Sequence, residues 1–253
     1  MKIKFITCSG ANETTDIVSL LALAEKFPIV EFGIQVSGEK CHYGSQRFKW
    51  INDLAGYAAQ QKVVLNIALH VNRSWAEECG QGNITRALAD LLDLKDCHGD
   101  FFAKRIQFNF KIGRDKAPDK AKLAALINSL KGRRCILSYN ESNKDLIQTL
   151  YREGVVFDCL YDESFGEGIA PKDRKAPAFI EAVQGYAGGI SPDNVRKTLN
   201  EIYQSWYASP NTAGIWLDAE GMLKGENKHL SLVKCCAYLE NAMDWRYEHR
   251  IDF

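Results

Sequence analysis

Short runs typical of β-strands alternate with longer amphipathic helical patterns along the whole chain, and the pair recurs eight times. The strand-like runs cover residues 2–8, 29–36, 63–71, 105–111, 134–139, 156–162, 183–187 and 213–219. The helical patterns cover residues 14–26, 46–60, 83–94, 118–131, 143–153, 174–182, 192–206 and 230–243. Eight strand–helix units in one chain predict an α/β fold, a (β/α)₈ TIM barrel, formed by a single domain over residues 1–253.

The helical pattern at 192–206 is clear, whereas the one at 174–182 is weak. Apolar residues at 195, 199, 202, 203 and 206 lie on one stripe, which predicts an amphipathic helix. Ser191 is placed to cap it and Pro192 to begin it. By contrast, "DESFGEGIAPKDRKAPAF" is typical of a long loop with two prolines, so we expect only about one helical turn near 174–182.

Composition excludes several functional classes. The formal net charge of zero is unlike the basic footprint of a nucleic-acid binder. No apolar run approaches the roughly 20 residues that span a membrane, and the start lacks a signal-peptide core. The eight cysteines form no C-x-x-C pair or regular framework, which favours free thiols. We therefore expect a cytoplasmic protein without a nucleic-acid or membrane partner, and the sequence indicates no oligomeric state.

Polar residues recur at every other position in three of the predicted strands. The sets are Glu31 with Gln35; Asn66 with His70 and Asn72; and Gln107 with Asn109 and Lys111. Alternation places each set on one side of its strand, and an outward face would press these groups against the helices. We therefore expect a polar cup at the carboxyl ends of the strands, where TIM-barrel active sites lie. His70, Asn109 and Asp218 are its expected substrate-binding residues.

Two residues at strand ends could form an acid–base pair. Cys8 ends the first strand and Asp162 ends the sixth, so a thiol and a carboxyl would face each other across the barrel mouth. From the spacing alone, Cys8 is more simply a small buried side chain, and Asp162 a loop-capping carboxylate.

The stretch "GYAGGISPDNV" places two glycines directly before a predicted helix start. Backbone N–H groups and the positive end of a helix dipole favour an anion there, although a plain tight turn explains a glycine pair as well.

Four stretches, in this order, resemble the motifs of phosphoribosylanthranilate isomerase. "KFITCSGANETTD" is similar to the opening of that family, where the first strand ends in a Cys-Gly pair. "LYDESFGEG", "GYAGGISPDNV" and "WLDAEGML" are similar to its sixth-, seventh- and eighth-strand motifs. The resemblance covers most of the chain, and the seventh-strand motif is the most specific.

The resemblance implies a cofactor-free isomerase. The family opens a phosphorylated aminosugar into an amino-ketose, an Amadori rearrangement in tryptophan biosynthesis, with no metal or organic cofactor. By this resemblance Cys8 is the general base and Asp162 the general acid. Gly188, Gly189 and Ile190 would bind the phosphate, together with Gly221 of the eighth-strand loop. This interpretation predicts that Cys8→Ser abolishes turnover and leaves the fold intact.

Several positions depart from the family pattern. His42, with Lys40 and Arg47 nearby, stands where the family has an anthranilate-binding Arg. Glu167 and Glu220 add negative charge near the expected phosphate site, and residues 72–104 make the chain longer than usual. These departures predict a small phosphorylated, sugar-like substrate different from that of the family, or a lost activity.

Two alternatives stay open beside the isomerase. A metal-assisted isomerase or epimerase would use oxygen-rich ligands suited to Mn²⁺ or Mg²⁺, drawn from Glu141, Asp162, Glu163, His70, Asp218 and Glu220. A Schiff-base enzyme through Lys111 is a minor form of this alternative. A barrel that binds a sugar phosphate without converting it is the other.

Overall fold

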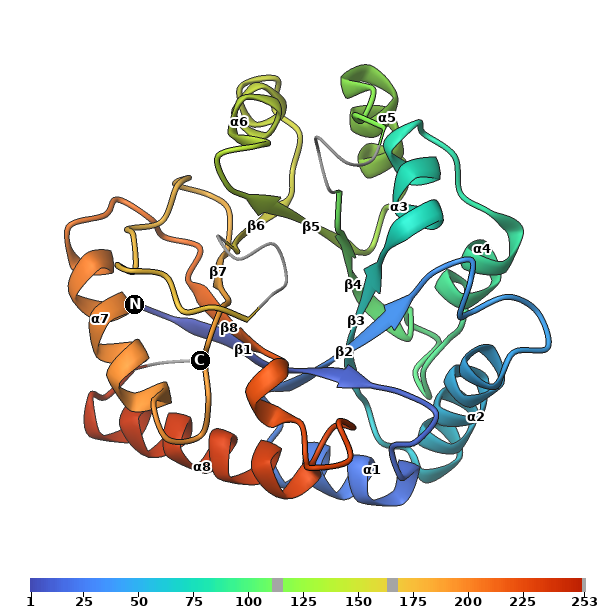
Figure 1. Ribbon diagram of the computed structural model, residues 1–253, viewed down its shortest axis with the longest axis horizontal. Coiled ribbons are helices and arrows are strands. Elements are labelled where there is room, and N and C mark those ends of the chain that lie inside the picture. Colours follow the sequence, from blue (N-terminus) through green and yellow to red (C-terminus); the bar gives the residue numbers. More distant parts are fainter. Residues whose placement is uncertain (111–115, 163–167, 252–253) are drawn as a thin grey trace.

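Each strand pairs in parallel with the next, and the first also pairs with the last, so the sheet closes into a barrel in the order β1 to β8. The computed structural model describes residues 1–110, 116–162 and 168–251. The strands are β1 (Ile3–Ala11), β2 (Val30–Val36), β3 (Asn66–Val71), β4 (Ala103–Phe108), β5 (Arg134–Tyr139), β6 (Asp158–Tyr161), β7 (Gln184–Tyr186) and β8 (Ile215–Ala219). The predicted (β/α)₈ TIM-barrel architecture is confirmed (Figure 1).

The helices surround the barrel (Figure 1). They are α1 (Ile17–Lys26), α2 (Gln46–Gln61), α3 (Arg73–Gly80), α4 (Arg86–Leu92), α5 (Lys120–Ser129), α6 (Lys144–Arg152), α7 (Val195–Tyr207) and α8 (Leu232–Glu248). A short 3₁₀ helix, η1 (Gly221–Leu223), follows β8. No helix in the described segments is long and apolar enough to cross a membrane.

The connections around β4 and β7 differ from the sequence prediction. The extra length at 72–104 holds a helix that the prediction missed, α3, in addition to α4. Residues 174–182 form no helix. Prolines at 171 and 177 disfavour one there, and neighbouring side chains bind the backbone instead: the Tyr186 hydroxyl donates to the carbonyl of Lys175, and the Asn211 amide donates to the carbonyls of Phe179 and Ala182.

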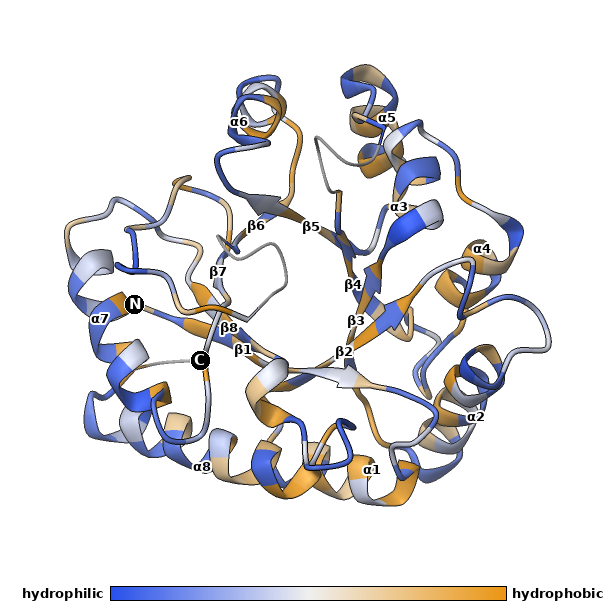
Figure 2. Ribbon diagram, in the orientation of Figure 1, coloured by the Kyte–Doolittle hydropathy of each residue, from blue (hydrophilic) through white to orange (hydrophobic). Residues whose placement is uncertain are grey.

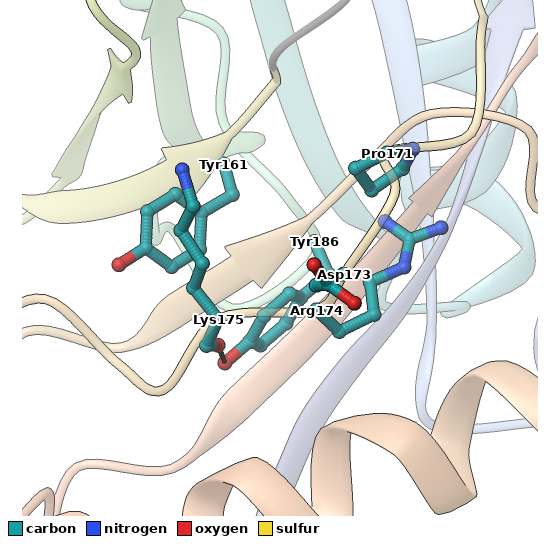
Figure 3. A pocket seen from close by; sticks show the side chains of 6 residues that line it. All are labelled: Tyr161, Pro171, Asp173, Arg174, Lys175 and Tyr186. Atoms are coloured by element: carbon teal, nitrogen blue, oxygen red, sulfur yellow. Dashed lines mark hydrogen bonds between the residues drawn. The ribbon is translucent and has the colours of Figure 1, made fainter.

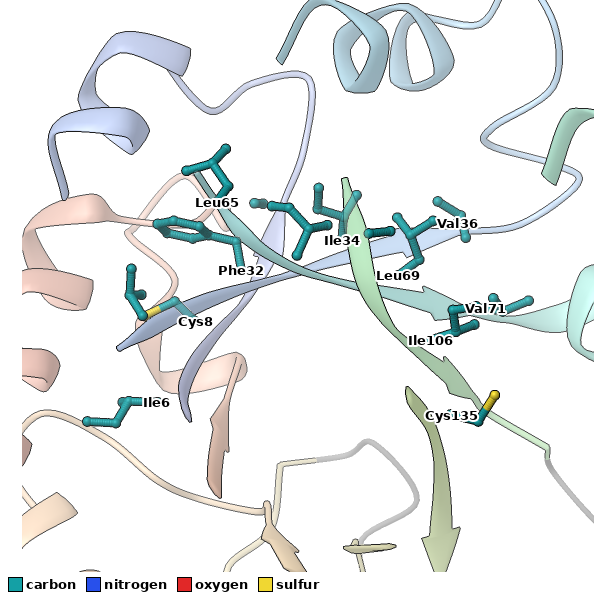
Figure 4. Close-up of a cluster of buried hydrophobic side chains, with 14 of the residues drawn as sticks. Ile6, Cys8, Phe32, Ile34, Val36, Leu65, Leu69, Val71, Ile106 and Cys135 are labelled. Carbon is teal, nitrogen blue, oxygen red and sulfur yellow. The ribbon is translucent and has the colours of Figure 1, made fainter. Parts of the chain in front are cut away.

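The apolar core lies mainly between the barrel and the helices. Alternation along β1 and β2 sends Ile6, Cys8, Phe32 and Ile34 outward into this layer, where each is fully buried. Figure 4 shows them together in the cluster. The helices present apolar faces inward and polar faces outward (Figure 2).

The inside of the barrel holds a second, smaller apolar cluster and a buried ion network. Ile136, Leu160 and Trp216 form the apolar part. Beside it the Arg105 guanidinium bonds Glu31 at 2.9 Å and Asp158 at 3.2 Å. Its Cζ lies 4.1 Å from the centroid of the Trp216 ring, within the range of a cation–π contact. A charge that is withdrawn from water this completely needs such partners, because desolvation is otherwise costly.

Replacing Arg105 by Met should lower the free energy of unfolding by about 3–5 kcal/mol, because it leaves the Glu31 carboxylate buried without its cation and removes one of the two cations of Asp158. Chemical denaturation of the two proteins measures the loss. Arg134→Met is the matched control: Arg134 is 41% exposed, and Asp158 keeps Arg105, so about 1 kcal/mol or less is expected. Equal losses in the two variants would contradict the role given to Arg105.

Candidate active site

The carboxyl-terminal end of the barrel gathers polar side chains from several strands. Ser9 of β1 and Asp218 of β8 are joined by a hydrogen bond, and the side chains of Ser9 and of His70 on β3 both lie over Gly33 of β2. Asp162 follows β6, and Glu220 follows β8. Active sites of TIM barrels lie at this end, so this group is the candidate active site.

Asp218 is the central carboxyl of the group. It is buried, and its Oδ1 accepts a hydrogen bond of 2.6 Å from the Ser9 hydroxyl. Burial raises the pKa of Asp218 to about 7, and the nearby charges of Glu220 and Asp162 raise it further against the opposing effects of Ser9 and Arg105. A carboxyl with this pKa both holds and releases a proton near neutral pH, which suits general acid–base chemistry.

His70 of β3 lies over Gly33 of β2. Its ring is buried, and burial lowers the pKa of His70 to about 4, although the charges of Glu31 and Glu220 oppose this effect. The imidazole is therefore neutral at physiological pH and acts as a hydrogen-bonding group there rather than as a cation.

A chain of amides continues from His70 along the barrel mouth. Gln107 donates to the Asn109 side chain at 2.7 Å, Asn109 donates to Asn72 at 3.0 Å, and Asn72 donates to the carbonyl of His70 at 2.8 Å. Each donation fixes the orientation of the next side chain. Asn109, expected to bind substrate, is thus brought near His70 by these bonds.

The negative charge of Glu220 is balanced by the nearby Lys224. Its carboxylate accepts from Lys224 at 2.9 Å and from the Gln35 amide at 3.0 Å. Gln35 is one of the polar strand residues expected in the cup, and this contact places it there. The repulsion that the sequence predicted between Glu220 and a phosphate is reduced by the Lys224 cation.

Cys8 does not reach this group, which corrects its expected place at the barrel mouth. Its side chain faces the helix layer, where it meets Cys235 of α8 and is fully buried. Burial raises the pKa of the Cys8 thiol well above its ordinary value, and Cys235 adds to the effect. A thiol in this setting stays protonated and cannot serve as a base at neutral pH.

Ser9 occupies the inward position that the sequence reasoning gave to Cys8. Successive residues of a strand point to opposite sides, so only one of the two can enter the barrel. A sequence difference could have identified Ser9 as the inward residue. In the family that the chain resembles, the Cys directly precedes the Gly, whereas here Ser9 precedes Gly10. Gly10 has a φ of +103°, and the register with β2 shifts between Ser9 and Ala11.

Asp162 lies one residue beyond β6, where its charge raises the pKa of Asp218. The charge of Asp162 thus acts on Asp218, whereas it is not among the charges that act on Cys8. Both carboxyls come from the ends of separate strands, the usual source of catalytic residues in this fold.

The glycine pair after β7 makes a close contact with the β6–β7 connection. Gly188 and Gly189 have φ values of +89° and +64°. A Cβ on Gly188 would stand 2.5 Å from the carbonyl oxygen of Ile169, and one on Gly189 would stand 2.8 Å from Ala170. Glycine is therefore required at both positions for backbone conformation and for close packing, whatever the pair binds.

The carbonyl groups and the N–H groups of this segment differ in their hydrogen bonding. The carbonyls of Gly188 and Gly189 accept from Arg174 and from Asn194, at 2.7 and 2.8 Å. For the N–H groups of Gly188, Gly189 and Ile190, the described residues supply no acceptor. Helix α7 begins only at Val195 and has Asn194 as its N-cap, so Ser191 and Pro192 precede the helix and do not open it, contrary to the prediction.

His42 and Gly221 lie in the loops after β2 and β8, not in the segment of the glycine pair. His42 is exposed in the loop after β2, and its ring contacts the carbonyl of the adjacent Tyr43. Arg47 is buried near it, paired with Glu13, and donates to the carbonyl of Gln35 at 2.8 Å. Gly221 begins η1, and a Cβ there would meet nothing within 4 Å, so close packing does not require a glycine.

A small pocket lies beside the ends of β6 and β7. Figure 3 shows its lining, which includes Arg174, Lys175, Tyr161 and Tyr186. Its volume of about 10 Å³ admits one water molecule and no substrate. A larger groove, of about 480 Å³, lies on the outer face of α1 and α2 and contains none of the residues at the barrel mouth.

The described residues of the metal alternative do not form a metal-binding group. In the described part of the chain, no three His, Cys, Asp or Glu side chains form a group that could hold a metal ion. Glu141 pairs instead with Lys144, at 2.6 Å. Glu163, Glu167 and Lys111 lie outside the described residues.

Comparison with known proteins found similar structures but no matching sequence. No protein-family model and no curated protein sequence matches the chain. The solved structures similar to it include TrpF from Jonesia denitrificans, with a TM-score of 0.49 and 14% identity over 95% of this chain and 97% of that one.

A second similar structure is a monomeric form of the dimeric phosphoribosylanthranilate isomerase from Thermotoga maritima. It has a TM-score of 0.34 and 14% identity over 95% of this chain and 87% of that one. The chain is thus structurally similar to these isomerases at low identity. At these values the likeness concerns the fold and establishes no activity.

The raised pKa of Asp218 should make the free energy of unfolding depend on pH. Between its ordinary pKa of 3.8 and about 7, the folded protein keeps a proton that the unfolded chain has released, so wild-type stability falls as the pH rises through this window. Asn does not titrate. We therefore compare the free energies of unfolding of the two proteins. The value for Asp218→Asn minus that for the wild type should increase by about 1.4 kcal/mol per pH unit within this window.

His70→Gln provides a control of opposite sign. His70 has a lowered pKa, so the unfolded chain holds the extra proton between about pH 4 and 6.5, and the difference from wild type should decrease as the pH rises. Denaturation curves at several pH values measure both slopes. Differences that stay flat with pH would show that neither group titrates as the site requires.

Proposed function

We propose that the chain is an isomerase-type enzyme that moves protons on a small phosphorylated, sugar-like substrate at the carboxyl-terminal end of the barrel. The observation that supports it most is Asp218, a buried carboxyl with a pKa of about 7 at the end of β8. Structural ion pairs also perturb pKa values, but among the described residues no cation is bonded to Asp218, and its hydrogen-bond partner is Ser9.

Two carboxyls can perform the proton transfers of an aldose–ketose or Amadori rearrangement. The ring oxygen of the sugar gains a proton as its bond to C1 breaks, and C2, the carbon next to C1, loses a proton to give an enolamine or enediol that tautomerises to the ketose. Asp218, which burial keeps protonated up to about neutral pH, donates to the oxygen. Asp162, whose charge acts on Asp218, takes the proton from carbon. This assignment reverses the acid role that the resemblance implied for Asp162.

The neighbouring neutral groups fit a hydroxyl-rich substrate. His70, Asn109 and Asn72 offer hydrogen bonds without a net charge, and Gln35 and Lys224 hold Glu220. A sugar presents donors and acceptors in close succession, which such amides and imidazoles can match.

The phosphate would bind at the glycine pair after β7. The N–H groups of Gly188, Gly189 and Ile190 precede α7 and have no acceptor among the described residues, which supports an anion there. Gly221 remains a proposed phosphate contact, and His42 a proposed contact to the rest of the substrate, by resemblance alone.

Activity should depend on Asp218 and not on Cys8. In D₂O, the wild type should exchange deuterium into the carbon next to the carbonyl of one member of a panel of pentose and hexose phosphates, aminosugar phosphates and phosphoribosylanthranilate. Proton NMR follows the exchange. Asp218→Asn should lower the rate by about 10²–10⁴-fold, and the wild-type rate should fall above pH 7 as Asp218 loses its proton.

Cys8→Ser is the matched comparison, because its side chain lies outside the barrel. It should keep the wild-type rate within a few-fold. A large loss in Cys8→Ser with full activity in Asp218→Asn would overturn the assignment.

Binding without conversion is the competing outcome. Sugar phosphates should raise the melting temperature of the wild type, and Gly189→Ala should weaken this effect because its Cβ would displace Ala170 and the adjacent backbone. Stabilisation by these ligands, with no deuterium exchange for any of them, would indicate a binding protein instead of an enzyme.

A further inference from the structure

The guanidinium of Arg174 binds two successive carbonyl groups of the segment that follows β7. Arg174 lies between Pro171 and Pro177 in the β6–β7 connection, in the stretch that forms no helix. Its Nη1 donates to the carbonyl of Ala187, and its Nη2 donates to the carbonyl of Gly188 at 2.7 Å. Figure 3 shows this side chain in the lining of the small pocket. One side chain therefore holds two neighbouring peptide units.

The direction of each N–H group follows from the carbonyl of the same peptide unit. In a planar trans peptide, the C=O of one residue and the N–H of the next point in opposite directions, and none of the described peptide bonds is cis. The N–H groups of Gly188 and Gly189 therefore point away from the guanidinium that holds the carbonyls of Ala187 and Gly188. By the same rule Asn194 directs the N–H of Ile190, because it donates to the carbonyl of Gly189 at 2.8 Å.

The N–H groups on either side of this run are satisfied within the protein. The N–H of Ala187 donates to the carbonyl of Tyr161 at 3.0 Å, and the N–H of Ser191 donates to the side chain of Asn194 at 2.8 Å. Between them, the N–H groups of residues 188–190 have no acceptor among residues 1–110, 116–162 and 168–251. The three groups thus form one continuous set of donors, with their carbonyls bonded by Arg174 and Asn194.

We propose that Arg174 is the positioning residue of the phosphate site, and that it turns the N–H groups of Gly188 and Gly189 toward the anion by holding the two carbonyls behind them. The inference rests on the proposed function, which places the phosphate at this glycine pair. The role needs an arginine, because a guanidinium carries its donors in a rigid planar fork and a lysine is a single point charge. The bonds are charge-assisted, so they also polarise both peptide units and strengthen their N–H groups as donors.

The same loop provides a comparison of equal charge. Lys172 lies two residues before Arg174 and is exposed, and its ammonium bonds none of the described residues. It contributes a positive charge near the glycine pair without holding either peptide unit. A change at Lys172 therefore measures the effect of charge alone.

Titration of the ¹⁵N-labelled protein with inorganic phosphate, at constant ionic strength, tests the inference. In the wild type, the amide protons of Gly188, Gly189 and Ile190 should move downfield as phosphate binds, because they then donate to a charged acceptor. In Arg174→Lys, the dissociation constant should rise about tenfold. At saturating phosphate, the shifts of Gly188 and Gly189 should be lost, whereas that of Ile190 should persist.

Lys172→Met is the matched control, and its dissociation constant should stay within about twofold of the wild-type value, because an exposed charge is screened by salt. Arg174→Gln replaces the lysine variant if that variant does not fold. The shorter amide can donate to one of the two carbonyls, so one of the two glycine shifts should remain. Equal weakening in Arg174→Lys and Lys172→Met would overturn the inference, as would the loss of all three shifts together.

The outcomes separate this inference from the proposed function. Phosphate that shifts the glycine N–H groups equally in the wild type and in Arg174→Lys would overturn the inference and leave the phosphate site in place. Phosphate that leaves them unmoved in the wild type would refute both. Because the titration requires no turnover, a failure to exchange deuterium into any sugar phosphate would refute the enzymatic activity without deciding the role of Arg174.

Discussion

The alternation of side chains along β1 determines what chemistry this barrel can perform. With a period of two residues, Thr7 and Ser9 enter the barrel while Ile6 and Cys8 enter the helix layer. The same rule on β2 sends Glu31, Gly33 and Gln35 inward. A shift by one residue would exchange a hydroxyl for a thiol at the mouth and remove the contact between Ser9 and Asp218.

The buried ion network and the candidate active site are parts of one interior. Arg105 satisfies Glu31 and Asp158 near the middle of the barrel, and its charge also acts on His70 and Asp218 nearer the mouth. The low-dielectric surroundings that make Arg105 dependent on its partners are those that raise the pKa of Asp218. The stability of the interior and the proton affinity of the site therefore have a common cause.

Much of the fold could be predicted because it follows local patterns. Repeated strand and helix signals gave the barrel, and alternating polar residues indicated that Gln35 and His70 line its mouth. The missing helix at 174–182 was harder to predict, since its backbone is bonded by side chains outside that segment, Tyr186 and the more distant Asn211. Propensity alone carries no information about such partners.

The site was predicted less completely, for a related reason. Asp162 and Asp218 were identified as strand-end carboxyls, but their mutual influence depends on barrel closure. Ser9 was missed because one inserted residue between Cys8 and Gly10 changes which side chain points inward. The raised pKa of Asp218 follows from burial, which a sequence pattern does not quantify.

A direct titration of the Asp218 carboxyl tests the account most simply. With ¹³C-labelled aspartate, the carboxyl resonance that disappears in Asp218→Asn can be followed from pH 3 to 9 in the folded wild type. The account predicts a midpoint near 7. A midpoint near the ordinary value of 3.8 would mean that Asp218 is ionised at neutral pH, and the proton donor of the proposed reaction would be lost.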